Sequence, residues 1–494
     1  MRSFFLFVIV SSLLFPSSTC ARVQGSVRGF SPSRDQTPRL AYTQELDRVK
    51  AQETLAATHP PDAIFYNGAV LTMEADVPQT QAIAILGNQI VAVGSDTDIL
   101  ALRATQTKVI NLDGLTLMPG FVDPHTHILN NSEYWGLDLK EVQQLALESG
   151  ITTLANMYTT PEFLTEMQNL ANSGELHVRT SLYLNYTTNC GEVLGDWYKA
   201  YPPTDQPGEM LRIGGVKIFA DGGSCGAPAL SYNHPVFGYG NLWFTQDELN
   251  SVVASLQASG YQAALHALGD RAVEQAMNAI ASALGGQPNT LRHRIEHSAV
   301  VRDDLLPRYS QIGIVPLIFG AYPACNTLIQ PPPPEYRAWE WRWKDLLNAN
   351  PNLHFAWHSD TPAVGPVSPL LNLYSMVTPH QVDKDGVTIC DTPAWLTAKT
   401  ITVQEALPMM TIEAAFALFR DDEVGSLKPG KFADLIILSD SPLAIEPEMI
   451  KNIETLMTMV SGHVEYCAPG HETMCPASDH GGMVYLPLVV QSGP

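Results

Sequence analysis

The stretch LMPGFVDPHTHIL, residues 117–129, places two histidines one residue apart directly behind an apolar run. Met118 and Phe121 are typical of a buried strand, where an unpaired imidazole is costly. Because side chains alternate along a strand, His125 and His127 are expected to point the same way and to be able to hold one ion. Two hydrogen-bonded loop histidines would be the simpler explanation of this short motif alone. The rest of the chain must supply further ligands.

Composition and charge narrow the class of partner. The chain has 494 residues, of which 45% are hydrophobic and 16% charged, enough for a large domain and a smaller one. Fifty acidic residues against 28 basic ones give a formal net charge of -22. Such a surface repels nucleic acid and anionic membranes. We expect a small-molecule substrate, no nucleic acid and no membrane span, and the sequence leaves a homo-oligomer open.

The N-terminus has the layout of a secretory signal peptide. Arg2 precedes an apolar run over residues 4–15 that is too short to cross a bilayer, and small residues follow. We therefore expect residues 1–21 to be removed and the chain to be exported, either secreted or periplasmic. A lipid anchor on Cys20 is disfavoured because residues 17–19 are a poor lipoprotein box.

Six cysteines remain after Cys20. In an oxidising compartment they could form three disulfides, of which only Cys467 with Cys475 is close enough in sequence to predict. In a chain of this length, buried free thiols explain several of them equally well. The other four are Cys190, Cys225, Cys325 and Cys390.

Strand-like runs near both ends of the chain predict one small β domain. DAIFYNGAVLTM and AIAILGNQIVAVG lie on the N-terminal side, and GSLKPGKFADLIIL and LMTMVSGHVEY on the C-terminal side. Gly87-Asn88 and Ser461-Gly462 are typical of hairpin turns between such strands. The predicted division is a signal peptide at 1–21, a weakly structured leader at 22–57, a composite, β-sandwich-like domain at 58–118 and 424–470, a large α/β barrel domain at 119–423 and a tail at 471–494.

Between these ends, eight apolar runs alternate with helical segments. Thr245 and Glu248 form a capping-box pattern ahead of apolar residues at helical spacing, which predicts a helix there. Eight strands alternating with helices predict an α/β fold of the (β/α)8 TIM-barrel type. The runs are LMPGFVD, ITTLANMY, RTSLYLNY, GGVKIFAD, YQAALHAL, HRIEHSAV, IGIVPLIF and HFAWHSD.

Isolated polar residues lie at the ends of several of these runs. Each has an ordinary explanation, such as a core histidine bonded to a carbonyl, a lysine that reaches solvent or a helix-capping aspartate. Together they indicate a metal site, because the carboxyl ends of barrel strands converge on one place. Besides His125 and His127, they are Lys217, His266, His297 and Asp360.

The sequence resembles the amidohydrolase superfamily of metal-dependent barrel hydrolases, and within it amidohydrolase family 3. The resemblance runs from about residue 62 to 466, in the family's order. Its segments are PGFVDPHTH, VKIFADGGSCG, LHALGDRAV, RHRIEH, HSDTPAV and GSLKPGKFADLIIL.

Carried over residue by residue, the resemblance implies two divalent metal ions, with zinc favoured and manganese or iron as alternatives. His125, His127 and Asp360 would hold one ion, His266 and His297 the other, and Lys217, carboxylated by carbon dioxide, would bridge them. Imidazoles and carboxylates suit these metals, and a lysine can join them only as an anionic carbamate. Burial favours the uncharged amine that reacts with carbon dioxide.

The implied reaction is hydrolysis of an amide-like, non-peptide C–N bond by a metal-bound hydroxide, which a metal makes available near neutral pH. Asp360 would serve as general base and then as general acid. A deaminase or a lactonase would use the same ligands. From a different class, an exported binding or regulatory protein could keep the barrel without turnover.

Some residues leave their roles open. The sequence has His358 where the family commonly has glycine, and this histidine could contact substrate or simply pack. The glycine-rich DGGSCGAPALSY is expected to border the pocket, with Cys225 more consistent with a structural or free thiol than with a nucleophile. Tyr322, Trp339 and Trp341 suggest an apolar or aromatic substrate group, although ordinary packing explains them as well.

Overall fold

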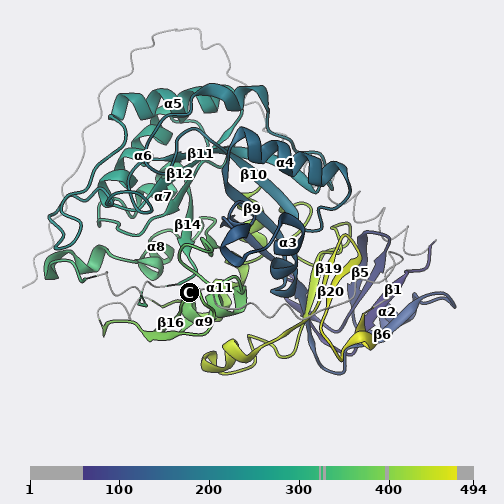
Figure 1. Ribbon diagram of the computed structural model, residues 1–494. Helices are drawn as coiled ribbons and strands as arrows, with labels where there is room; N and C mark the ends of the chain where they lie inside the picture. Colours follow the sequence, from purple (N-terminus) through teal and green to yellow (C-terminus); the bar gives the residue numbers. More distant parts are fainter. Residues whose placement is uncertain (1–58, 322–323, 326–329, 395–399, 476–494) are drawn as a thin grey trace, which may run out of the picture. The chain divides into compact units, whose positions relative to one another are not determined.

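The computed structural model describes residues 59–321, 324–325, 330–394 and 400–475 (Figure 1). The predicted signal peptide, the predicted leader, Tyr322 and most of the predicted tail lie outside this part of the chain. Within the described residues, no helix has both the length and the apolar character needed to cross a bilayer.

Eight parallel strands form the central sheet, and each coincides with one of the eight predicted apolar runs. Neighbours in the sheet follow the order of the chain, as repeated strand–helix units of a barrel do. The predicted (β/α)8 class is therefore confirmed. The strands are β8 (Phe121–Thr126), β9 (Ile151–Thr159), β10 (Arg179–Asn185), β11 (Leu211–Phe219), β12 (Gln262–Ala267), β13 (Arg294–His297), β14 (Val315–Phe319) and β15 (Ala356–His358).

The first and last strands close the ring near their carboxyl ends. The Asp360 backbone N–H donates to the His125 carbonyl at 3.1 Å. The Trp357 indole N–H donates to the Val122 carbonyl at 2.8 Å. Residues far apart in sequence thus become neighbours at the mouth of the barrel.

The first predicted run differs from the structure because it contains two strands. β7 (Thr116–Pro119) pairs antiparallel with β18 (Leu435–Leu438) in the β domain, and β8 begins the barrel after Gly120. A Cβ at Gly120 would meet the Thr152 side chain at 2.2 Å, so only glycine allows this close approach. An unbroken apolar run gave no sign of the change of sheet.

Helices follow most barrel strands, and their start signals lie in the sequence. α5 begins behind the predicted capping box, in which Thr245 and Glu248 bond reciprocally. Figure 1 shows α5 beside α6, both next to β12. The barrel helices are α3 (Leu139–Glu148), α4 (Pro161–Asn172), α5 (Gln246–Ala258), α6 (Asp270–Leu284), α7 (Arg308–Ile312), α8 (Trp343–Ala349), α9 (Pro369–Val377), α11 (Val403–Met409) and α12 (Ile412–Ala417).

Both ends of the described chain build the small β domain, as predicted. One sheet has the order β5-β4-β1-β6 and the other β20-β19-β18-β7-β2-β3. Phe65, Ile83, Leu117 and Ile437 belong to one buried cluster that both sheets share, so the domain is sandwich-like. Its remaining strands are β1 (Ala63–Tyr66), β2 (Ala69–Leu71), β3 (Gln79–Thr80), β4 (Ala82–Leu86), β5 (Gln89–Gly94), β6 (Lys108–Asn111), β19 (Thr455–Val460) and β20 (His463–Cys467).

All six cysteines considered above form disulfides. Cys467 pairs with Cys475, as predicted. The other two bridges are Cys190–Cys225 and Cys325–Cys390, so the alternative of free thiols is wrong for these residues. Cys225 is therefore structural rather than a nucleophile.

Candidate metal centre and active site

The carboxyl ends of the barrel strands surround a cavity of about 920 Å³. The loop that contains Gly223, Ser224 and Gly226 borders it, as expected for the glycine-rich segment. All six predicted metal ligands line this cavity, although their roles stay predictions: His125, His127, Lys217, His266, His297 and Asp360.

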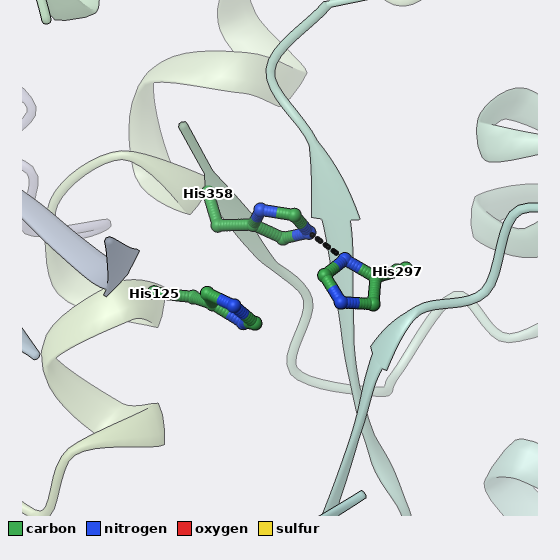
Figure 2. Close-up of side chains that lie close together, drawn as sticks. All are labelled: His125, His297 and His358. Carbon is green, nitrogen blue, oxygen red and sulfur yellow. Dashed lines mark hydrogen bonds between the residues drawn. The ribbon is translucent and has the colours of Figure 1, made fainter. Parts of the chain in front are cut away.

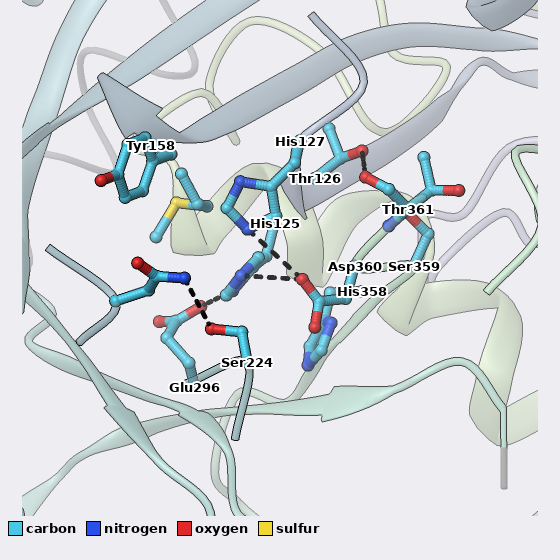
Figure 3. A network of polar contacts seen from close by, with 12 residues as sticks. His125, Thr126, His127, Tyr158, Ser224, Glu296, His358, Ser359, Asp360 and Thr361 are labelled. Carbon is cyan, nitrogen blue, oxygen red and sulfur yellow. Dashed lines mark hydrogen bonds and ion pairs between the residues drawn. The ribbon is translucent and has the colours of Figure 1, made fainter. Parts of the chain in front are cut away.

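His125, His127 and Asp360 form one compact group of predicted ligands (Figure 3). One carboxylate oxygen, Asp360 Oδ1, lies 3.4 Å from His127 Nε2 and 3.5 Å from His125 Nε2. One ligand atom from each of the three residues lies within 4.8 Å of the others. The strand alternation inferred from the sequence thus brings both imidazoles to the same carboxylate.

Asp360 is held in its charged form. Burial works to raise the pKa of this carboxyl, but the bonds from His125 and His127 outweigh burial and keep the pKa well below its usual range. Asp360 is therefore a charged carboxylate at neutral pH, with lone pairs that a metal ion can accept.

Lys217 lies on β11, fully buried, with its Nζ atom 3.4 Å from His125 Nε2. Burial lowers the pKa of Lys217 to about 8. At pH 7 the amine of Lys217 is then uncharged in about a tenth of the molecules, a far larger fraction than for an exposed lysine. This uncharged form is the one that can react with carbon dioxide.

His266 and His297, the predicted ligands of a second ion, lie with their ring centroids 4.6 Å apart. His266 Nε2 contacts the Gly222 carbonyl at 3.2 Å, which leaves Nδ1 as the ring nitrogen for a metal. Burial lowers the pKa of His266 to about 3, and that of His297 well below its usual range, so both rings are neutral and can coordinate.

His358 does not line the cavity, and Figure 2 shows its ring next to those of His125 and His297. Its Nε2 atom is 3.2 Å from His297 Nδ1, and its ring stacks on that of His125 with centroids 4.8 Å apart. Among the residues that the structure describes, His125, His297 and His358 form a second group whose ligand atoms lie within 4.8 Å of one another. Of the two roles left open for His358, packing in the barrel interior fits its position, and contact with substrate does not.

Glu296 is a site residue that the sequence analysis missed. Its Oε2 atom lies 2.5 Å from His125 Nδ1, on the side of the ring away from Asp360 (Figure 3). Arg294 Nε donates to Glu296 Oε1 at 2.6 Å. Two opposite charges two residues apart in a buried strand were the available signal in the segment RHRIEH.

The backbone explains how neighbouring residues both reach the barrel interior. His297 ends β13 with a φ of 76°, and Asp360 has a φ of 51°. Left-handed backbone at residues other than glycine costs about 1–3 kcal/mol and tends to occur at functional sites. At His297 it interrupts the strand alternation that would otherwise turn Glu296 and His297 to opposite faces.

Two tethers fix the glycine-rich loop at the cavity. The Cys190–Cys225 disulfide joins it to the segment after β10. Asp221 accepts hydrogen bonds from the backbone N–H groups of Ala229, Leu268 and Gly269. The loop is therefore attached to its neighbours at its first residue and near its middle.

The residues present suit a divalent metal. Neutral imidazoles and a charged carboxylate are the donors that zinc, manganese and iron share. They converge on a partly enclosed cavity, where a substrate can approach. The donor set thus fits the metal that the barrel and its motifs imply.

The chain belongs to the amidohydrolase family whose model matches residues 139–466. The family name denotes a class of hydrolases and fixes neither the reaction nor the substrate of this chain.

Two curated relatives match part of the chain. "Putative amidohydrolase YtcJ" of Bacillus subtilis (strain 168) is 26% identical over 265 residues, 52% of this chain and 48% of that protein. "Protein LONG AFTER FAR-RED 3" of Arabidopsis thaliana is 30% identical over 285 residues, 54% of this chain and 45% of that protein. The matched part thus spans slightly less than half the length of each relative.

A solved structure shares the fold over most of the described chain. It is an uncharacterised metal-dependent hydrolase from Pyrococcus furiosus, with a TM-score of 0.64 and 19% sequence identity. The alignment covers 77% of this chain and 99% of that one. At this identity the likeness concerns the fold alone.

Proposed function

We propose that this protein is an exported hydrolase that cleaves an amide-like, non-peptide C–N bond of a small molecule. The observation that carries the proposal is the convergence of His125, His127 and Asp360 on one cavity, beside a buried lysine with a lowered pKa. This combination provides metal ligands, a base and a bridging group in one place.

In this proposal, two divalent ions are held by the residues that line the cavity. When bound, the metal lowers the pKa of a water molecule and polarises a carbonyl group. The proposed ligands are His125, His127 and Asp360 for one ion, His266 and His297 for the other, and Lys217 as a bridging carbamate.

Asp360 moves the proton. Its carboxylate is charged at neutral pH, faces the cavity and lies beside His127, so it can accept a proton from the attacking water. It can then deliver that proton to the leaving nitrogen, which expels the amine. One side chain thereby serves as base and then as acid.

The cavity suits a small substrate with an apolar group. Its volume of about 920 Å³ is in the range of small-molecule sites. Phe219, Phe319 and Trp341 contribute apolar surface near the proposed ligands. These rings can hold an apolar or aromatic part of the substrate while the carbonyl lies over the ligands.

The export part of the proposal has separate support. The N-terminal sequence has the pattern of a signal peptide. Three disulfides join all six cysteines outside that segment, and structural disulfides persist mainly in oxidising compartments. Fractionation of cells that express the full-length chain, with N-terminal sequencing of the product, tests this part directly.

Product identification tests the reaction. The metal-loaded protein is incubated with neutral N-acyl amines, amino-heterocycles and lactones, and released amine, ammonia and carboxylate are measured separately. We expect amine and carboxylate from the N-acyl amines. If only ammonia is released, the protein is a deaminase instead. If only lactones yield carboxylate, it is a lactonase. Tight binding without turnover would identify it as a binding protein.

A further inference from the structure

A buried chain of charged and polar groups stands behind the first predicted ligand. Glu296 Oε2 lies 2.5 Å from His125 Nδ1. Arg294 donates to both oxygens of that carboxylate, from Nε at 2.6 Å and from Nη2 at 2.9 Å. All three side chains are inaccessible to solvent, with exposed fractions of 1% or less.

The arginine of this chain is itself fixed. Arg294 Nη2 donates to the Pro124 carbonyl at 2.7 Å, and Nη1 donates to the Tyr183 hydroxyl at 3.2 Å. The guanidinium therefore anchors Glu296 and the backbone next to His125 at the same time. Glu296 has no room to turn away from the imidazole.

A buried ion pair in this position is not explained by stability alone. The cost of removing two charges from water often exceeds their attraction, and an apolar pair of similar volume commonly does as well. The placement of Glu296 against a predicted metal ligand points to a role in the site.

The bond sets which nitrogen of His125 can coordinate. A charged carboxylate accepts hydrogen bonds and donates none, so His125 Nδ1 must carry the proton. In a neutral imidazole the other nitrogen, Nε2, then has a free lone pair. Nε2 is the atom that faces Lys217 Nζ at 3.4 Å and Asp360 Oδ1 at 3.5 Å.

We propose that Glu296, held by Arg294, is a positioning residue that fixes the tautomer and orientation of His125 for metal binding. This inference rests on the metal site of the proposed function. Carboxylate partners of ligating histidines raise the basicity of the ligand, and their loss typically weakens metal binding about 10–100-fold. Glu296 does not line the cavity, so in this proposal it acts through His125.

The variant Glu296→Gln tests the proposal with nearly unchanged volume. The amide cannot serve Arg294 and His125 together as two charged oxygens do, because one of its ends is a donor. The affinity of metal-free protein for Zn²⁺ is measured by competition with a chromophoric chelator. We expect Glu296→Gln to bind Zn²⁺ about 10–100-fold more weakly than the wild type.

Asp434 provides a matched control. It is also a fully buried carboxylate paired with an arginine, Arg179, at 2.6 Å, but it lies in the β domain and contacts no predicted ligand. Asp434→Asn should lower the stability of the protein and leave its Zn²⁺ affinity unchanged. Thermal unfolding of each metal-free variant separates lost stability from lost affinity.

The outcomes separate this inference from the function on which it rests. If the wild type binds no Zn²⁺, the proposed metal site itself is wrong. If the wild type binds Zn²⁺ and Glu296→Gln binds it equally well, the site stands and Glu296 is only a structural partner. Should Glu296→Gln fail to fold, Glu296→Asp keeps the charge but withdraws it from His125 by one methylene. Wild-type affinity in that variant would also overturn the proposal.

Discussion

Asp360 Oδ1 lies 3.4 Å from His127 Nε2, and the same oxygen lies 3.5 Å from His125 Nε2. Residues at the carboxyl ends of the first and the last strand of the barrel therefore meet at one carboxylate oxygen. The backbone bond from Asp360 N–H to the His125 carbonyl keeps the two chain segments in register. The proposed chemistry depends on this junction.

Replacing Asp360 by asparagine should remove the proton acceptor while keeping the size of the side chain. We expect kcat/KM for the best N-acyl substrate to fall at least about 100-fold, the lower end of the effect of general acid–base groups. Asp383, another aspartate that lines the cavity, supplies the control Asp383→Asn. Equal losses in the two variants would contradict the role given to Asp360.

The Cys190–Cys225 disulfide should hold the rim of the cavity. Its removal by serine at both positions is expected to lower the free energy of unfolding by about 2–4 kcal/mol. KM should rise as well, because Asn189 and Ser224, next to the two cysteines, line the cavity. Replacing Cys467 and Cys475, which lie in the β domain, is the control and should leave KM unchanged. A wild-type KM in the variant that lacks the Cys190–Cys225 disulfide would show that this bond does not position the rim of the cavity.

His293 should make the protein sensitive to mild acid. Burial lowers the pKa of this histidine to about 4, from 6.5. Between these values the unfolded chain binds a proton that the folded protein does not, so stability is present above pH 6.5 and is lost as the pH falls toward 4. Between pH 7 and pH 5 the loss is about 2 kcal/mol. The free energy of unfolding of the metal-free protein is measured with urea at pH 7 and pH 5. In His293→Gln the difference between the two pH values should be smaller by this amount than in the wild type. An equal difference would contradict the role given to His293.

Breaking the ion pair between Arg179 of the barrel and Asp434 of the β domain should destabilise the chain strongly. Both side chains are fully buried, so Asp434→Asn leaves an uncompensated guanidinium. We expect a loss of about 3–5 kcal/mol in the free energy of unfolding, measured with urea. The exposed Asp440 provides the control Asp440→Asn, which should change stability little. Similar small changes in both variants would mean that water reaches the Arg179 site.

Most of the fold could be predicted because its elements have strong periodic signals. All eight barrel strands appeared as apolar runs, and the hairpin turns at Gly87 and at Gly462 were marked by their turn residues. The boundary between two strands at Gly120 could not be predicted because apolar residues continue through it. The pairing of Cys190 with Cys225 could not be predicted because it depends on which loops lie close together in the fold.

The candidate site was predictable where strand ends determine it. His125, His127, Lys217, His266, His297 and Asp360 all follow from the rule that carboxyl ends of barrel strands converge. Glu296 was missed because its neighbour His297 was assigned to the site, and alternation places adjacent side chains on opposite faces. The left-handed φ of His297 breaks that alternation, and a sequence pattern does not show such a local backbone conformation.

Elemental metal analysis of the signal-free protein, purified without chelator or histidine tag, tests the central claim most directly. The account predicts close to two metal atoms per chain, and a lower content in Lys217→Ala because the bridging group is lost. About one atom per chain, unchanged in Lys217→Ala, would remove the bridging role of Lys217. A content near zero that added metal does not restore would contradict the hydrolase mechanism proposed for this site.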